Sequence, residues 1–120
     1  MTLKERIDVL VELGDYLRNW DSEPEAQAVA QQAWVENKWF TTENIAKAVQ
    51  AIANTMLNKE LLENWAAQYD ISENLHPEHT VGIVMAGNIP LVGFHDWLCV
   101  FISGQRAKVK LSEKDKHLLP

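Results

Sequence analysis

Apolar residues recur at the three- and four-residue spacing of amphipathic helices through most of the first 70 positions. This spacing predicts four helices, of which the first three begin near Thr2, Ser22 and Thr41–Thr42, while Asn58 separates the third from the fourth. Thr2 and Glu5 form a capping box for the first helix, over residues 2–20, and Pro24 suits the first turn of the second. The apolar face of the fourth helix carries Leu61, Leu62, Trp65 and Tyr69.

The pattern changes after residue 70, where residues 71–80 form a polar connector with a proline and no periodicity. Residues 81–86 are almost all apolar, which is typical of a strand buried on both faces of a parallel sheet. Residues 91–102 are apolar on all sides and too long for a strand, so they predict a buried helix, which Gly104 ends. A second strand is expected over residues 106–111, and Ser112 with Asp115 resembles the cap of a further helix.

These elements predict an α/β fold in which a helical region over residues 1–70 precedes a strand–helix–strand unit over residues 81–120. The connection between the two strands is long enough for a right-handed crossover, which would make them parallel. Two strands do not cover both faces and both edges of a parallel sheet. We therefore expect the sheet to be completed either by more chain of the same protein, which is the simpler account, or by a partner.

The composition and net charge of the chain argue against some classes of function. The 120 residues are 47% hydrophobic and 23% charged, as in an ordinary globular domain, and the net charge of −6 argues against a nucleic-acid surface. No apolar run is long enough for a membrane span, and the charged N-terminus does not read as a secretory signal, so we expect a cytoplasmic protein. The single cysteine, Cys99, lies in an apolar run that favours an inert thiol.

Two residues at predicted strand ends are candidates for chemistry, because ligands of open α/β sheets bind at the carboxyl ends of the strands. Asn88 follows the first strand and is either the N-cap of the next helix or an amide donor to a developing oxyanion. Lys110 ends the second strand on the same face as Lys108, and is either an exposed lysine or a ligand of ribose hydroxyls or phosphate. The spacing of glycines in a classical dinucleotide fingerprint is absent.

Histidines give weaker signals. His76 and His79 stand three apart in a proline-containing connector without a cysteine or another histidine nearby, which favours solvated side chains over a metal site. His95 and Asp96 are adjacent in a predicted helix and therefore do not share a face, which argues against a catalytic dyad. No metal is predicted.

The segment Met-Ala-Gly-Asn-Ile-Pro-Leu at residues 85–91, followed by Val-Lys-Leu-Ser-Glu at residues 109–113, resembles the paired motifs of aldehyde dehydrogenases. Those motifs are a Trp-Asn-Phe-Pro-Leu turn and a Lys-Pro-Ser-Glu strand end. The longer string through His95 and Asp96 is more specifically similar to the bacterial long-chain acyl-CoA reductases, relatives of the luminescence fatty-acid reductase, some of which are labelled acyltransferases. The resemblance covers most of this chain but only the opening part of such proteins.

The resemblance implies reduction of a fatty acyl-CoA to an aldehyde with NADPH, through attack of a cysteine on the thioester. By position, Asn88 matches the oxyanion-stabilising asparagine and Lys110 the cofactor lysine, while Ser112 and Glu113 belong to the same cofactor motif. Leu111 replaces the proline of that motif, and residues 85–87 replace bulkier turn residues. Since Cys99 matches no catalytic position, the nucleophile is expected beyond this chain, which alone should be inactive.

Two other hypotheses remain. The chain is alternatively a non-catalytic helical interaction or dimerisation module, in which some of its five tryptophans mark an interface. Because Trp34, Trp39 and Trp65 lie on predicted helix faces, packing in the core is preferred for them. The third hypothesis is an aldehyde dehydrogenase that works in the oxidative direction.

Overall fold

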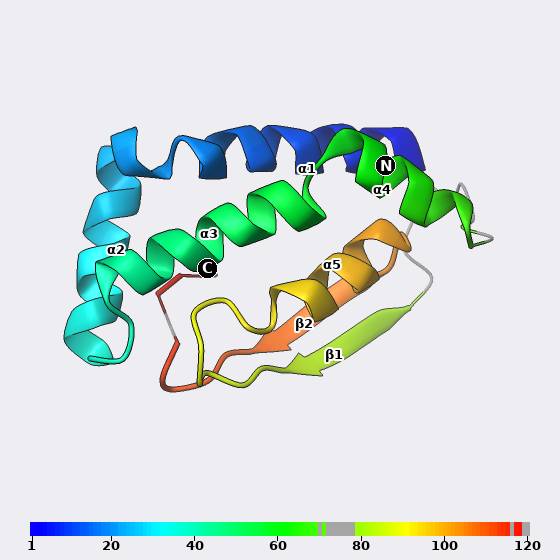
Figure 1. The fold of residues 1–120 in the computed structure, drawn as a ribbon. Coiled ribbons are helices and arrows are strands. Elements are labelled where there is room, and N and C mark those ends of the chain that lie inside the picture. Colours follow the sequence, from blue (N-terminus) through cyan, green and yellow to red (C-terminus); the bar gives the residue numbers. More distant parts are fainter. Residues whose placement is uncertain (70, 72–78, 116, 119–120) are drawn as a thin grey trace.

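The computed structural model describes residues 1–69, 71, 79–115 and 117–118. It is a mixed α/β structure whose helices form one layer above a short parallel sheet, with α5 between them (Figure 1). The elements in chain order are α1 (Leu3–Arg18), η1 (Trp20–Ser22), α2 (Pro24–Glu36), α3 (Thr42–Met56), α4 (Lys59–Ala67), β1 (Thr80–Val84), α5 (Phe94–Ile102) and β2 (Arg106–Lys110). Among the described residues, no helix has the length and apolarity needed to cross a membrane.

Helix α1 starts where its sequence predicts. The backbone N–H of Glu5 donates to Thr2 Oγ1 at 3.2 Å, and the N–H of Thr2 donates to the Glu5 carboxylate at 2.7 Å, which completes the predicted capping box. The helix buries Ile7, Leu10 and Leu17 against the other helices. It ends two residues earlier than expected, because the chain tightens into the 3₁₀ turn η1.

The predicted start of the second helix at Ser22 is wrong. Ser22 ends η1 and donates its hydroxyl to the carbonyl of Asn19 at 2.8 Å, so its oxygen does not cap α2. Glu23 occupies the N-cap position without a side-chain hydrogen bond, and Pro24 is the first residue of α2, as predicted. The buried face of α2 consists of Ala26, Ala30 and Ala33, whose small side chains let it pack closely.

Helix α3 begins at its predicted cap, and Asn58, which was predicted to separate α3 from α4, is the N-cap of α4. The Thr41 hydroxyl accepts from the N–H of Asn44 at 3.1 Å, and the Asn58 side chain accepts from the N–H of Leu61 at 3.2 Å. Phe40, directly before the cap of α3, and Ile45 are fully buried, in the positions of a hydrophobic staple. These caps satisfy backbone donors that the first turn of a helix leaves unpaired.

Some predicted apolar positions are exposed. Trp39 is 84% exposed, which contradicts its predicted packing in the core, because it lies in the connection between α2 and α3 rather than on a helix. Trp34 and Trp65 are partly buried. On the predicted apolar face of α4, Leu62 is buried, but Leu61 is exposed, and so is Tyr69, which lies beyond the end of the helix.

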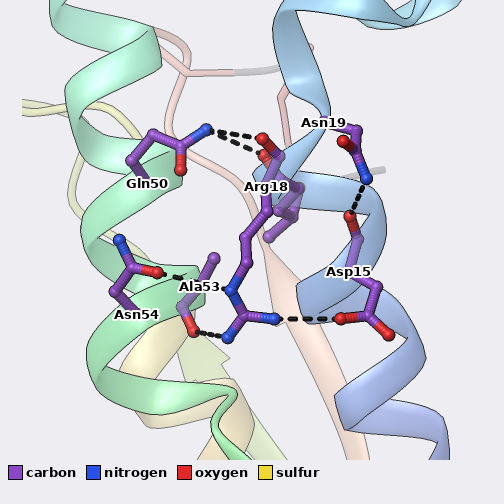
Figure 2. Close-up of polar contacts among 7 residues, drawn as sticks. Asp15, Arg18, Asn19, Gln50, Ala53 and Asn54 are labelled. Atoms are coloured by element: carbon purple, nitrogen blue, oxygen red, sulfur yellow. Dashed lines mark hydrogen bonds and ion pairs between the residues drawn. The ribbon is translucent and has the colours of Figure 1, made fainter.

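A polar cluster joins the C-terminal end of α1 to the C-terminal half of α3 (Figure 2). The Arg18 guanidinium donates to the Ala53 carbonyl at 2.8 Å, to Asn54 Oδ1 at 3.3 Å and to Asp15 Oδ1 at 3.1 Å. Gln50 donates to the carbonyls of Leu17 and Arg18, both at 3.2 Å. The cluster therefore satisfies the carbonyls at the C-terminal end of α1, which have no partner within the helix itself.

The two strands pair in parallel, with Thr80 opposite Arg106 and Val84 opposite Lys110. The predicted burial of β1 on both faces is wrong, since Ile83 is its only buried residue and Val84 is 80% exposed. The reason is that α5 covers one face of the sheet, while the described residues leave the other face open (Figure 1). Both strands are also shorter than predicted and end at Val84 and Lys110.

The crossover helix α5 begins at Phe94, three residues later than predicted, because residues 90–93 form turns. Leu91 has a positive φ of 56°, a left-handed conformation that a helix does not contain. At the other end, Gly104 adopts a φ of 83°, which confirms its predicted role in ending the helix. The buried Arg6 packs over Gly104 and donates to the Ile102 carbonyl at 3.3 Å, so α1 also caps α5.

Candidate functional site

The ends of the two strands come together at the carboxyl edge of the sheet. The N–H of Met85 donates to the Lys110 carbonyl at 3.0 Å, and this bond extends the pairing one residue past β1. Gly87 then lies against Ser112 so closely that a Cβ atom at position 87 would be 2.7 Å from the Ser112 Cβ. Only glycine fits there, because any side chain would push the segment after β1 away from the segment after β2.

These two segments line a groove of about 790 Å³ together with the connection between α2 and α3. The lining consists of residues 36–39, 87–88 and 113–114. It contains the carboxylates of Glu36 and Glu113, the amines of Lys38 and Lys114, and the exposed indole of Trp39. The groove is thus a polar, charge-balanced hollow with one aromatic surface, at the position where open α/β sheets bind ligands.

Asn88 lies in this groove, and the structure removes one of its two interpretations. The N-cap of α5 is Gly93, five residues later in the chain, so Asn88 neither caps the helix nor stands at its N-terminus. Its side chain is exposed and forms no hydrogen bond with any described residue. The amide N–H₂ group is therefore free to donate to a ligand in the groove.

The three residues predicted to hold a cofactor lie at different places. Glu113 lines the groove with Asn88. Ser112 is half-buried beneath Gly87, where its hydroxyl accepts from the N–H of Lys114 at 3.2 Å. Lys110 is exposed on the outer face of the sheet beside Lys108, as the alternation in the strand predicts, and it does not line the groove. The fold therefore brings Asn88 and Glu113 into one site and leaves Lys110 outside its lining.

The predicted helix after β2 is absent from the described residues, and Asp115 does not take part in a cap. Its N–H donates to the Ser112 carbonyl at 3.1 Å, which closes a turn. Its carboxylate is 8% exposed and accepts from the N–H of Leu91 at 3.0 Å. Burial raises the pKa of Asp115, while the backbone N–H groups of Leu91 and Leu118 and the nearby His117 oppose that rise.

The loop after β2 is also fastened to the end of α2. Asn37 donates from its side chain to the Lys114 carbonyl at 3.1 Å, and its Oδ1 accepts from the N–H of Trp39 at 3.1 Å. His117 Nε2 lies 3.7 Å from a Glu36 carboxylate oxygen. The hydrophobic periodicity of the sequence did not indicate these links. Asn37 and Trp39 lie in the connection between α2 and α3, and residues in such connections often take part in binding.

Cys99 does not join this site. Its sulfur lies 3.9 Å from His95 Nδ1, but burial raises the pKa of the thiol and nearby Asp96 raises it further, as expected for an unactivated cysteine. His95 and Asp96 are both exposed. Among the described residues, no three His, Cys, Asp or Glu side chains group as metal ligands; His79 is exposed, and His76 lies outside the described residues.

Comparisons with models of known protein families, with curated proteins and with solved structures found no match to this chain.

Proposed function

We propose that this chain is the N-terminal part of an NADPH-dependent acyl-CoA reductase with an aldehyde-dehydrogenase-like fold, which converts a fatty acyl-CoA thioester to an aldehyde. One observation carries the proposal: Asn88, after β1, and Glu113, after β2, line one groove at the carboxyl end of two parallel strands. The order and type of these residues match the paired motifs described above, and the groove is the place where this fold class binds its ligands.

In the proposed reaction, a cysteine thiolate from a later part of the same protein attacks the thioester carbonyl. Negative charge then develops on the carbonyl oxygen, and the Asn88 amide donates a hydrogen bond to it. The oxyanion collapses to an enzyme thioester and releases the CoA thiolate. One such donor typically contributes a factor of about 10²–10³ to turnover. When bound, NADPH supplies the hydride that turns the enzyme thioester into the aldehyde and a free cysteine thiolate.

The residues after β2 fit the ribose and phosphate groups of a dinucleotide. The Glu113 carboxylate faces the groove and accepts hydrogen bonds from ribose hydroxyls. Lys110 ends β2 three residues before Glu113 and does not line the groove, so in this proposal its flexible four-carbon stem carries its ammonium to a hydroxyl or a phosphate of the bound cofactor. Ser112 contributes by fixing the backbone of this loop, since its hydroxyl accepts a hydrogen bond from the N–H of Lys114.

A fluorescence titration of the 120-residue chain with NADPH tests the cofactor role. Trp39 reports binding, because it lines the groove, is exposed, and emits where NADPH absorbs. We expect quenching that Trp39→Phe removes. Lys110→Met should weaken binding by roughly tenfold, as the loss of about 1.4 kcal/mol implies, whereas Lys108→Met should leave it unchanged. No saturable quenching, or equal effects of the two lysine variants, would reject the assignment.

The exposed sheet supports one alternative function, a dimerisation module whose sheet is completed by a second copy. Apart from Ile83, β1 is exposed along its whole length, and in the part of the chain that the structure describes each strand has one unpaired edge. Sedimentation of the isolated chain separates the two functions. A folded monomer at micromolar concentration rules out completion by a second copy.

A further inference from the structure

Asp115 joins the two loops that build the groove. It follows β2, and its carboxylate accepts from the backbone N–H of Leu91, which follows β1 and is 24 residues earlier in the chain. Because Asp115 is 8% exposed, water does not compete for this bond. The second oxygen, Oδ1, is also buried and forms no hydrogen bond with the described residues. The bond to Leu91 therefore ties the carboxylate to the turn after β1, while the Leu118 N–H and His117, which also act on the carboxylate, belong to its own loop.

The bond falls on a strained residue. Leu91 has a φ of 56°, a left-handed conformation that is unfavourable for a residue with a Cβ atom. Such strain persists only where the surroundings enforce it, and it gathers at functional sites. Here the strained residue stands three positions after Asn88, in the turn that separates Asn88 from α5. The direction of that turn sets where the Asn88 amide lies.

The loop that carries Asp115 is itself fixed to the helical layer. Asn37 holds the Lys114 carbonyl at 3.1 Å, and the Lys114 N–H is bonded to Ser112. The end of α2 therefore holds the loop after β2, and Asp115 in that loop holds the turn after β1. Apart from it, the described residues give the 88–91 turn two backbone bonds, from Phe94 N–H to the Leu91 carbonyl at 3.0 Å and from Val92 N–H to the Ile89 carbonyl at 3.4 Å, and both are local in sequence.

From this geometry we infer that Asp115 is a positioning residue, which holds the Leu91 turn so that the Asn88 amide faces the groove shared with Glu113. The inference rests on the proposed function for its consequence, since Asn88 needs a fixed orientation only if it donates to a ligand. Preorganisation of this kind is what makes a hydrogen-bond donor effective toward a developing charge.

Three substitutions in the 120-residue chain separate positioning from simple stabilisation. Asp115→Ala removes the acceptor, Asp115→Asn keeps an acceptor of the same shape, and Asp115→Glu keeps the charge but moves it by one methylene. The matched control is Gln27→Ala, which also removes a side-chain bond to a backbone group, the Trp20 carbonyl at 2.8 Å, at a place remote from the groove. All four are compared with the unmodified chain by urea unfolding.

Two readouts follow the site itself. The first is nuclear magnetic resonance, with hydrogen exchange of the Leu91 amide and the side-chain amide resonances of Asn88. The second is the NADPH dissociation constant from Trp39 fluorescence. We expect Asp115→Ala and Asp115→Glu to accelerate Leu91 exchange, shift the Asn88 resonances and weaken NADPH binding by about tenfold, the ratio for 1.4 kcal/mol. Asp115→Asn should restore both readouts, and Gln27→Ala should change neither.

The outcomes are distinguishable. If Asp115→Glu and Asp115→Ala leave Leu91 exchange and the Asn88 resonances unchanged, Asp115 does not position the turn and the inference is overturned. If Asp115→Ala fails to fold, the glutamate and asparagine variants decide the same question. If the unmodified chain does not bind NADPH, the proposed cofactor role fails, and the resonance measurements alone decide whether Asp115 sets the position of Asn88.

Discussion

The helical layer and the strand-end groove satisfy their backbone and side-chain groups in opposite ways. In α1, α3 and α4 the caps come from the residue just before the helix, and the buried side chains are apolar except for Arg6. Around the groove, the polar groups are held by residues distant in sequence, such as Asp115 on Leu91 and Asn37 on Lys114. Two of the three side-chain atoms that are buried without a hydrogen bond among the described residues, Asp115 Oδ1 and His117 Nε2, belong to the loop after β2, and the third is Arg6 Nη2 in α1.

This contrast indicates where stability and where chemistry are located. The helical layer contains most of the buried apolar residues, and these dominate the free energy of folding. The groove combines a left-handed leucine and a buried carboxylate, each of which costs stability, with an exposed Asn88 amide that is free to bind a ligand. Departures from local consistency of this kind are expected at functional sites.

The largest expected effect is a loss of stability caused by a substitution in the helical layer. Phe40 is 1% exposed, so Phe40→Ala should lower the free energy of unfolding by about 3–5 kcal/mol through the lost burial and the cavity left behind. Val84→Ala in β1 should change it by less than about 0.5 kcal/mol, because that side chain is already in solvent. Urea unfolding of both variants measures the difference. Equal losses would show that the sheet is as important to stability as the helices.

The next effect lies at the junction of the two regions. Arg6 is 3% exposed and donates to the carbonyls of Ile102 and Met1, so Arg6→Met leaves two carbonyls without their donor. We expect a loss of about 1–3 kcal/mol and faster hydrogen exchange at the C-terminal end of α5. Arg106→Met is the control, since Arg106 is exposed at the start of β2 and should be neutral. A neutral Arg6→Met would contradict the role of α1 in capping α5.

A smaller effect is expected within the helical layer, at the polar cluster of Figure 2. Arg18→Met removes the donors to Ala53 and Asn54 and should cost about 1 kcal/mol in urea unfolding. Lys47→Met removes only an exposed ion pair with Glu43 and should cost less than about 0.5 kcal/mol. If Arg18→Met and Lys47→Met lower the free energy of unfolding by similar amounts, the cluster adds no more stability than an exposed ion pair.

The smallest effect is a pH dependence with opposite signs in the two regions. Burial raises the pKa of Asp115 above 3.8, so its ionisation costs stability, and the free energy of unfolding falls as pH rises from 3.8 through the native pKa. The stability of Asp115→Asn relative to the unmodified chain should therefore rise across this interval. In the helical layer, the bond from Lys4 lowers the pKa of Asp8, so that contribution is present above 3.8 and is lost as pH falls through the native pKa.

Urea unfolding at several pH values, with Asp8→Asn as the comparison, measures the two signs. The relative stability of Asp8→Asn should rise as pH falls below 3.8, whereas that of Asp115→Asn should rise as pH increases above 3.8. The same sign in both variants would mean that the Asp115 carboxylate is not buried in solution.

The helices were largely predictable because their signals are local. Thr2, Thr41 and Asn58 cap the turns that they precede, and the apolar spacing identifies the buried faces. The predicted helix start at Ser22 was wrong because its hydroxyl bonds within a 3₁₀ turn. The predicted packing of Trp39 in the core was wrong because this residue lies in an exposed connection. Both outcomes depend on contacts that hydrophobic periodicity does not contain.

The groove was predictable only in part. Strand pairing places Asn88 near Glu113, and this follows from the strand–helix–strand pattern. The late start of α5, the left-handed conformation of Leu91 and its bond to Asp115 do not, because hydrophobic periodicity carries no information on a contact between residues 24 positions apart. Asp115 could be assigned to a helix cap from its spacing to Ser112, but its carboxylate is used by a different loop.

The most direct test of the proposed reaction is acyl-CoA-dependent oxidation of NADPH by the product of the complete coding sequence. We predict that a long-chain acyl-CoA is reduced, that Asn88→Ala lowers turnover by about 10²–10³, and that its melting temperature is unchanged, since Asn88 makes no hydrogen bond with the described residues. The 120-residue chain alone should not oxidise NADPH. Oxidation by this chain alone, or parallel losses of turnover and stability in Asn88→Ala, would contradict the account.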